Sequence, residues 1–284
     1  MEKTNIRRLI GVMMPFVIMV ILQRLGYLLL DMTSLSGVLR DLLAFVIASA
    51  GGIFFFRMSC GKDVLRLTAD PVPETDEDDE RAVPPFPQRD TLPGQVMYIL
   101  VCVGALIVTM HIVAMVVKET PADRLDTQSL AAEFVSLVFL HPILEEYIFR
   151  WLYYRELRPM HPIFAGLAQA VMFAIVHGSV GGMIYALFAG VVLVFVMEHA
   201  GSLAVSAVAH MIVNLRSFAF MTVLADHAHL RTVIDFCVVS VGFGAFLALM
   251  VRRGLREIWK NTETEEQEEG DGHDGDDAGT AGDD

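Results

Sequence analysis

Cysteine is scarce in this sequence of 284 residues, and the few cysteines do not group. Cys60, Cys102 and Cys237 lie far apart and mostly in apolar runs. This spacing does not fit a structural zinc site and argues against a disulfide framework. We therefore expect the three thiols to be small core or lipid-facing residues.

Two common hydrolase signatures are also absent. The sequence contains no G-x-S-x-G motif, which would indicate a serine nucleophile, and no H-E-x-x-H motif, which would indicate a zinc protease. The basic residues flank apolar segments and do not form a separate patch, so we expect no nucleic-acid partner. If the chain hydrolyses a bond, other residues must activate the water.

The negative charge is concentrated in two segments. The chain is 54% hydrophobic with a mean hydropathy of +0.52, which is well above ordinary soluble domains and predicts a membrane protein. The formal net charge of −13 comes from residues 68–93 and 261–284, and the rest of the chain carries about +4. The acidity therefore belongs to linkers and not to a substrate-binding surface.

Both acidic segments have few side chains that could be buried. We expect residues 68–94 to be a Pro-rich cytoplasmic linker and residues 261–284 a disordered acidic tail, either solvated or docking a basic partner. The remaining units are two transmembrane helices in 1–67, a third helix and loop in 95–127, a core in 128–224 and a last transmembrane helix in 225–260.

Long apolar runs determine the predicted fold class, because a helix needs about 20 mostly apolar residues to cross a bilayer. The first run is too long for a cleavable signal peptide, and no small-residue cleavage site follows it. The sequence predicts an all-α, polytopic membrane helix bundle of about eight transmembrane helices. The candidate spans are 9–30, 38–56, 95–117, 129–155, 162–177, 182–199, 203–223 and 232–251.

The positions of lysine and arginine predict the orientation. With eight spans, the basic residues before the first span and after the second, fourth and eighth all fall on one side. We expect this side to be the cytoplasm. The chain would then be a multi-pass plasma-membrane protein with both termini in the cytoplasm.

Polar side chains inside the fourth to seventh spans are unusual, because such groups are costly in a membrane unless they pair or line a cavity. They are Glu145, Glu146, Arg150, Gln169, His177, Glu198, His199, His210, Asn214 and Arg216. At about 1.5 Å per residue, Glu145, His177, His210 and Asn214 lie within about two helical turns of one another in depth. We expect these four to meet in one buried cluster, and Glu198, His199, His161 and Arg216 to be interfacial.

Such a cluster has the parts for hydrolysis by an activated water. A desolvated glutamate is suited to act as a general base, and a neutral histidine can share or relay the proton. Asparagine and a second histidine can donate hydrogen bonds to an oxyanion. The alternative is structural, with each histidine a packed bundle residue, Glu146 and Arg150 a buried i,i+4 pair, and Phe173 a packing residue in either case.

Three motifs carry a resemblance to a known family. "EEYIFR" (Glu145 to Arg150), "FAIVH" (Phe173 to His177) and "HMIVN" (His210 to Asn214) resemble the E-E-x-x-x-R, F-x-x-x-H and H-x-x-x-N motifs of the CPBP intramembrane proteases. This is the family of type II CAAX prenyl endopeptidases and bacteriocin-processing or Abi proteins. The resemblance covers about residues 128–224. Trp151 departs from it, because the family often has glycine after the arginine.

The resemblance implies an intramembrane endopeptidase that acts on a peptide or lipidated protein substrate in the lipid bilayer. Glu145 would activate water with His177, His210 and Asn214 would stabilise the oxyanion, and Glu146 and Arg150 would shape and neutralise the site. A metalloprotease with one zinc held by Glu145, His177 and His210 is a second mechanism. We favour the purely glutamate-driven mechanism.

Two other functions use the same polar cluster. An ion-coupled transporter would bind a cation or proton there, but it predicts an internal repeat, and the sequence has none. A catalytically silent scaffold or immunity protein would keep the fold without turnover, and the presence of every expected catalytic residue argues against it. The sequence does not identify the substrate.

Overall fold

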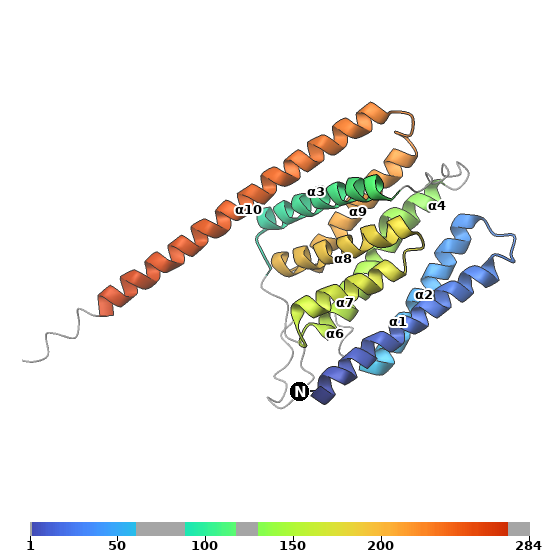
Figure 1. Cartoon of the computed structure of the whole chain (residues 1–284), viewed down its shortest axis with the longest axis horizontal. Helices are drawn as coiled ribbons and strands as arrows, with labels where there is room; N and C mark the ends of the chain where they lie inside the picture. Colours follow the sequence, from blue (N-terminus) through green and yellow to red (C-terminus); the bar gives the residue numbers. More distant parts are fainter. Residues whose placement is uncertain (1, 61–88, 118–129, 272–284) are drawn as a thin grey trace, which may run out of the picture.

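The chain is a bundle of membrane-length helices. The computed structural model describes residues 2–60, 89–117 and 130–271, and these ranges contain helices and turns but no strand (Figure 1). The all-α expectation is therefore confirmed. Residues 61–88, 118–129 and 272–284 lie outside the described residues, and with them most of the expected linker and the end of the expected tail.

Helices α1 (Glu2–Leu30) and α2 (Gly37–Cys60) form an antiparallel hairpin at one edge of the bundle (Figure 1). Small residues let the two helices approach closely. A Cβ added at Gly26 would lie 3.1 Å from the Cβ of Ala44. At the turn between the helices, the hydroxyl of Thr33 donates to the Leu30 carbonyl at 2.6 Å and satisfies an acceptor at the end of α1.

Helices α3 (Leu92–Val116) and α10 (Ala228–Asp271) pack against each other at the opposite edge (Figure 1). The α3 helix begins at Leu92, slightly earlier than expected, because the Thr91 side chain caps it and a proline follows in its first turn. Gly104 of α3 and Gly242 of α10 lie at the point where the two helices cross. A Cβ at Gly242 would lie 2.7 Å from the Leu100 carbonyl oxygen and 3.1 Å from the Gly104 Cα.

The fourth predicted span is one continuous helical rod with two π-helical stretches. Its segments are α4 (Leu130–Phe134), η2 (Val135–Leu140), α5 (His141–Glu145), η3 (Glu146–Tyr154) and α6 (Arg155–Leu157). The π-helix is rare and occurs often at functional sites. Pro142 gives a local reason for η2, because in an α-helix its ring would clash with the carbonyl four residues earlier.

Three further helices complete the bundle, namely α7 (Pro162–Ile175), α8 (Val180–Ala200) and α9 (Leu203–Met221). The Ser179 side chain caps the start of α8, and Gly201, at a φ of 61°, provides the left-handed residue that ends it. The buried Gln169 amide ties α7 to α8 by donating to the Gly166 and Gly190 carbonyls at 3.0 and 2.9 Å.

Six helices of the described ranges are long and apolar enough to cross a membrane, namely α1, α2, α3, α8, α9 and α10. The expected polytopic helix bundle is therefore confirmed, with the exact number of spans approximate. The two remaining predicted spans are the rod and α7. The rod contains acidic and basic side chains. Helix α7, at about 1.5 Å per residue, spans roughly 21 Å of a bilayer core that is about 30 Å thick.

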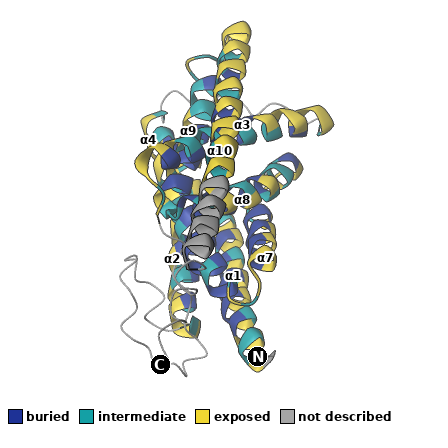
Figure 2. Ribbon diagram, turned by 90° about the vertical axis from the view of Figure 1, so that its left-hand side faces the viewer, coloured by how far each residue is buried: buried dark blue, intermediate teal, exposed yellow. Residues whose placement is uncertain are grey.

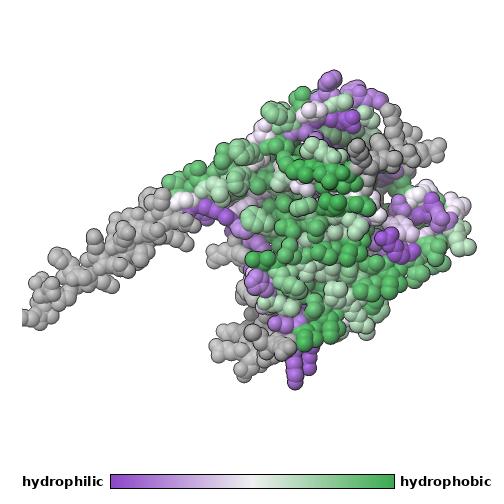
Figure 3. Space-filling model, in the orientation of Figure 1, coloured by the Kyte–Doolittle hydropathy of each residue, from purple (hydrophilic) through white to green (hydrophobic). Residues whose placement is uncertain are grey.

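Apolar side chains cover most of the surface over the helices in Figure 3, and Figure 2 shows many exposed residues on α10. The chain is an integral multi-pass membrane protein.

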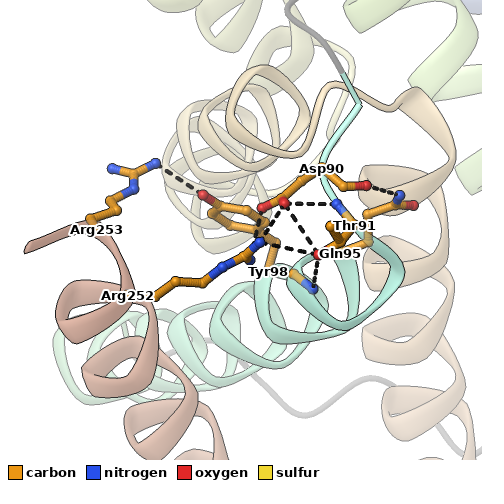
Figure 4. Close-up of polar contacts among 7 residues, drawn as sticks. Asp90, Thr91, Gln95, Tyr98, Arg252 and Arg253 are labelled. Atoms are coloured by element: carbon orange, nitrogen blue, oxygen red, sulfur yellow. Dashed lines mark hydrogen bonds and ion pairs between the residues drawn. The ribbon is translucent and has the colours of Figure 1, made fainter. Parts of the chain in front are cut away.

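The bundle has two distinct ends. We call the end at which α1 begins the proximal end, and the end at which α1 finishes the distal end. Ion pairs link helices at the proximal end: Arg8 with Glu156 at 3.2 Å, Arg158 with Glu198 at 2.9 Å, and Arg252 with Asp90 at 3.0 Å (Figure 4).

Helix α10 is longer than expected at the proximal end. It continues to Asp271, whereas the sequence predicted disorder from residue 261. The segment that follows the last span is rich in Glu, which is a good helix former, and a helix already nucleated by the span extends at little cost. The expected disorder of residues 272–284 lies outside the described residues.

Candidate active site

Glu146 lies at the centre of a buried ion cluster. Its Oε1 lies 3.2 Å from Nη1 of Arg150, one turn further along the rod, and 3.0 Å from Nδ1 of His210 on α9. The side chains of Glu146 and Arg150 are 1% and 0% exposed. A buried carboxylate requires such a counter-charge, so Arg150 compensates the charge of Glu146.

His210 lies between two carboxylates. Because an ionised carboxylate only accepts hydrogen bonds, Nδ1 of His210 donates to Glu146. The other ring nitrogen, Nε2, faces Oε2 of Glu145 at 3.7 Å. This separation is longer than a hydrogen bond, so Glu145 lies next to the imidazole without bonding to it, while Glu146 orients the ring.

Phe173 has a larger part in the site than its sequence context indicated. The Arg150 guanidinium lies 4.2 Å from its ring centroid, a cation–π contact. The rings of His177 and His210 approach it edge-on, with centroids at 4.7 and 6.0 Å. One buried aromatic ring on α7 thus contacts three polar site residues, which the spacing of motifs along the sequence could not indicate.

His177 is placed differently from the other site residues. Its Nδ1 donates to the Phe173 carbonyl at 2.8 Å, which leaves Nε2 as the acceptor nitrogen of the neutral ring. Within the ranges that the structure describes, His177 makes no hydrogen bond or ion pair with Glu145 or Glu146. The histidine in contact with Glu145 is therefore His210, although the family resemblance implied a pairing of Glu145 with His177.

Asn214 lies one turn beyond His210 on α9 and faces the rod. Its amide nitrogen donates to the Leu137 carbonyl oxygen in η2 at 2.8 Å. Leu137 lies in the same rod as Glu145 and precedes it by eight residues. Asn214 is thus tied to the π-helical part of the site.

A metal ligand set was one alternative for Glu145, His177 and His210. Among the residues that the structure describes, no group of three or more His, Cys, Asp or Glu side chains is arranged to hold a metal ion. His177 and His210 each donate through Nδ1, which leaves Nε2 of each ring as the potential ligand, but only His210 contacts Glu145. These residues do not fit a zinc site in this arrangement, so we derive no step through a metal.

The other polar residues singled out in the sequence lie apart from this cluster. Glu198 pairs with Arg158 at the proximal end, and Nδ1 of His199 bonds to the carbonyl of Phe195. Arg216, which was expected to be interfacial, belongs to a second polar cluster at the distal end. It pairs there with the buried Asp235 of α10, which the sequence analysis missed.

Comparison with known proteins locates the family signal in the same part of the chain. Residues 127–216, roughly a third of the sequence, match the family model described as type II CAAX prenyl endopeptidase Rce1-like. Searches of curated proteins and of solved structures gave no match. The matched segment contains the rod, α7, α8 and most of α9, and so all the residues of the cluster around Glu146. Over residues 127–216, the chain is therefore similar to the type II CAAX prenyl endopeptidase Rce1-like family.

Proposed function

We propose that the chain is an intramembrane endopeptidase that hydrolyses a peptide bond near the C-terminus of a prenylated, membrane-associated protein. The observation that supports this most directly is the position of His210 between two glutamates. Arg150 compensates Glu146, while the Glu145 carboxylate lies 3.7 Å from Nε2 of His210. A carboxylate and a neighbouring imidazole are the parts of a general base and acid.

The reaction follows from this pair. Water attacks the scissile carbonyl carbon while one of its protons passes to Glu145. Nε2 of His177, with its lone pair free, accepts the second hydrogen of the water and orients it. The Asn214 amide donates to the oxyanion of the tetrahedral intermediate. When the C–N bond breaks, the proton moves from the Glu145–His210 pair to the leaving nitrogen, and a carboxylic acid and an amine are released.

Cleavage by the full-length protein in liposomes tests the proposal. The probes are a quenched fluorescent peptide with a farnesylated C-terminal CAAX sequence and the same peptide without the prenyl group. Glu145→Gln should lower the cleavage rate by roughly 10²-fold to 10⁴-fold, which is the usual contribution of a general base. Wild-type rates in this variant would exclude Glu145 as the base.

Glu198→Gln is the matched control, because Glu198 is a partly buried carboxylate in the same bundle but pairs with Arg158 at the proximal end. Its cleavage rate should stay close to that of the wild type. The two peptides test the substrate class. Equal cleavage of both would contradict the prenylated substrate and leave the peptidase activity standing.

The proximal end is proposed to face the cytoplasm. It carries Arg8, Arg57, Arg252 and Arg253, and positively charged residues are retained on the cytoplasmic side. An epitope tag at either terminus should bind antibody only in permeabilised cells. A tag that binds antibody on intact cells would reverse the orientation.

A further inference from the structure

Pro142 changes the hydrogen bonding of the rod just before the two glutamates. In a helix, the carbonyl of residue 137 accepts from the N–H four residues later in an α register or five residues later in a π register. Those two residues are His141 and Pro142. The N–H of His141 bonds to Ser136, and proline has no N–H. Leu137 therefore has no backbone donor in either register.

Asn214 supplies the donor that the rod lacks. Its Nδ2 lies 2.8 Å from the Leu137 oxygen, and the two residues are 77 positions apart in the sequence. A backbone carbonyl without a backbone donor requires another hydrogen-bond partner, and the Asn214 amide provides it. The missing N–H of Pro142 thus creates the acceptor that holds the side chain of Asn214.

The turn that contains Pro142 is itself fixed by its neighbours. Nδ1 of His141 lies 3.0 Å from the Ser136 carbonyl oxygen. The His141 ring stacks on Phe45 of α2, with centroids at 4.0 Å and an interplanar angle of 24°. The Leu137 carbonyl is therefore presented by a constrained segment.

We propose that Pro142 and the Leu137 carbonyl are positioning elements for Asn214. An asparagine amide has two N–H donors. The bond to Leu137 uses one of them and sets the plane of the amide, so that the second N–H points in a defined direction one turn from His210. This inference rests on the proposed function only for its catalytic consequence, because the contact itself can be measured without turnover.

Solid-state NMR of the full-length protein in liposomes tests the contact directly. The chain has only three asparagines, Asn5, Asn214 and Asn261, so side-chain ¹⁵N labelling of asparagine gives few signals, and Asn214→Asp assigns the relevant one. With ¹³C-carbonyl leucine, the Asn214 nitrogen should show strong dipolar dephasing in the wild type. If the wild type shows no such dephasing, the proposal is wrong, and no variant is needed to decide this.

Pro142→Ala restores the N–H and provides Leu137 with a backbone donor. We expect weaker dephasing at Asn214, and a kcat for the farnesylated peptide that falls about 10-fold to 100-fold with little change in KM, because misplacement of a donor by about 1 Å has effects of this size. Pro162→Ala is the matched control. Pro162 lies in the first turn of α7, where an added N–H needs no acceptor, so neither readout should change.

A double-mutant comparison separates positioning from a general packing effect. In an Asn214→Ala background, Pro142→Ala should lower kcat no further, because it acts through Asn214. The proposal would be contradicted if Pro142→Ala lowered kcat by the same factor in the Asn214→Ala background, or if Pro142→Ala left the dephasing at Asn214 unchanged. If the wild type cleaves neither peptide, the proposed function fails, while the dephasing still decides whether Pro142 positions Asn214.

Discussion

Arg252 of α10 forms a two-pronged ion pair with Asp90, the residue before the cap of α3 (Figure 4). Nη2 lies 3.0 Å from Oδ1 and Nη1 lies 3.2 Å from Oδ2, and Nη2 also donates to the Thr91 hydroxyl at 3.1 Å. The N–H of Asp90 bonds to the Ala200 carbonyl at the end of α8. One aspartate thus joins α3 and α10, which lie outside the segment that matches the family model, to α8, which lies inside it.

This contact should make stability depend on pH. Burial alone would raise the pKa of Asp90, but the Thr91 N–H and the Arg252 guanidinium outweigh it and lower that pKa. A carboxyl whose pKa is lowered on folding stabilises the protein above its unfolded pKa of about 3.9, and the stabilisation disappears as the pH falls through the folded value. Asp90→Asn should therefore cost about 1 kcal/mol at pH 7 and little at pH 3. Thermal unfolding in detergent at both pH values measures this.

The control for Asp90 is Asp31→Asn. Asp31 also pairs with an arginine, Arg40, but its side chain is 78% exposed. Its removal should change the unfolding midpoint little at either pH. An equal loss in the two variants would mean that the lower exposure of Asp90 is unimportant.

The crossing of α3 and α10 should tolerate no side chain at Gly242. A methyl group there would lie 2.7 Å from the Leu100 oxygen, whereas a methyl group at Gly244 would meet nothing within 4 Å. Gly242→Ala should therefore destabilise the protein by about 1–3 kcal/mol. Gly244→Ala, on the same helix, should be neutral or stabilising because alanine is the better helix former. Unfolding midpoints of the two variants decide the matter, and similar values would contradict the close crossing.

The distal cluster should depend on both charges of its ion pair. Arg216 donates to both carboxylate oxygens of Asp235, and Nε2 of His111 lies 3.4 Å from Oδ2. Asp235→Asn leaves the arginine without its counter-charge, and we expect a loss of about 3–5 kcal/mol. Replacing both partners, with Arg216→Met and Asp235→Leu together, should recover much of it. Chemical denaturation of the three proteins tests this, and a double variant no more stable than Asp235→Asn would contradict it.

The two adjacent glutamates should respond differently to amide substitution. Glu146→Gln keeps an oxygen for Nδ1 of His210 but leaves the fully buried Arg150 without a counter-charge. It should lower stability by about 3–5 kcal/mol and reduce cleavage by the folded protein less than Glu145→Gln does. Unfolding midpoints, together with cleavage rates normalised to folded protein, separate the two effects. A larger rate loss in Glu146→Gln would mean that Glu146, and not Glu145, is the general base.

Metal removal should leave cleavage unchanged. In the described part of the chain, no three potential ligands converge, and His210 rather than His177 pairs with Glu145. Dialysis against a chelator should therefore preserve the rate, and elemental analysis should find no stoichiometric metal. About one zinc per chain in the wild type that disappears in His177→Ala would instead support a metalloprotease.

Much of the fold could be predicted because helix formation in a membrane depends on local composition. An apolar run of sufficient length must satisfy its own backbone hydrogen bonds, so the positions of α1, α2, α3, α8 and α9 follow from hydropathy. The rod around Glu145 was predicted as a span, but its two π-helical stretches were not, because register depends on single residues such as Pro142 and on packing. The helical extension of α10 to Asp271 was missed because acidic composition was taken to indicate disorder.

The sequence by itself determined the membrane class, the all-α bundle and the set of polar residues that share the later helices, since these properties depend on residue order and helical spacing. Only the tertiary structure decided which side chains meet. His210 rather than His177 contacts Glu145, Asn214 bonds to Leu137, and Arg216 pairs with Asp235. Spacing along a helix establishes which residues share a face, but the partner of each face depends on how the helices rotate and cross when they pack.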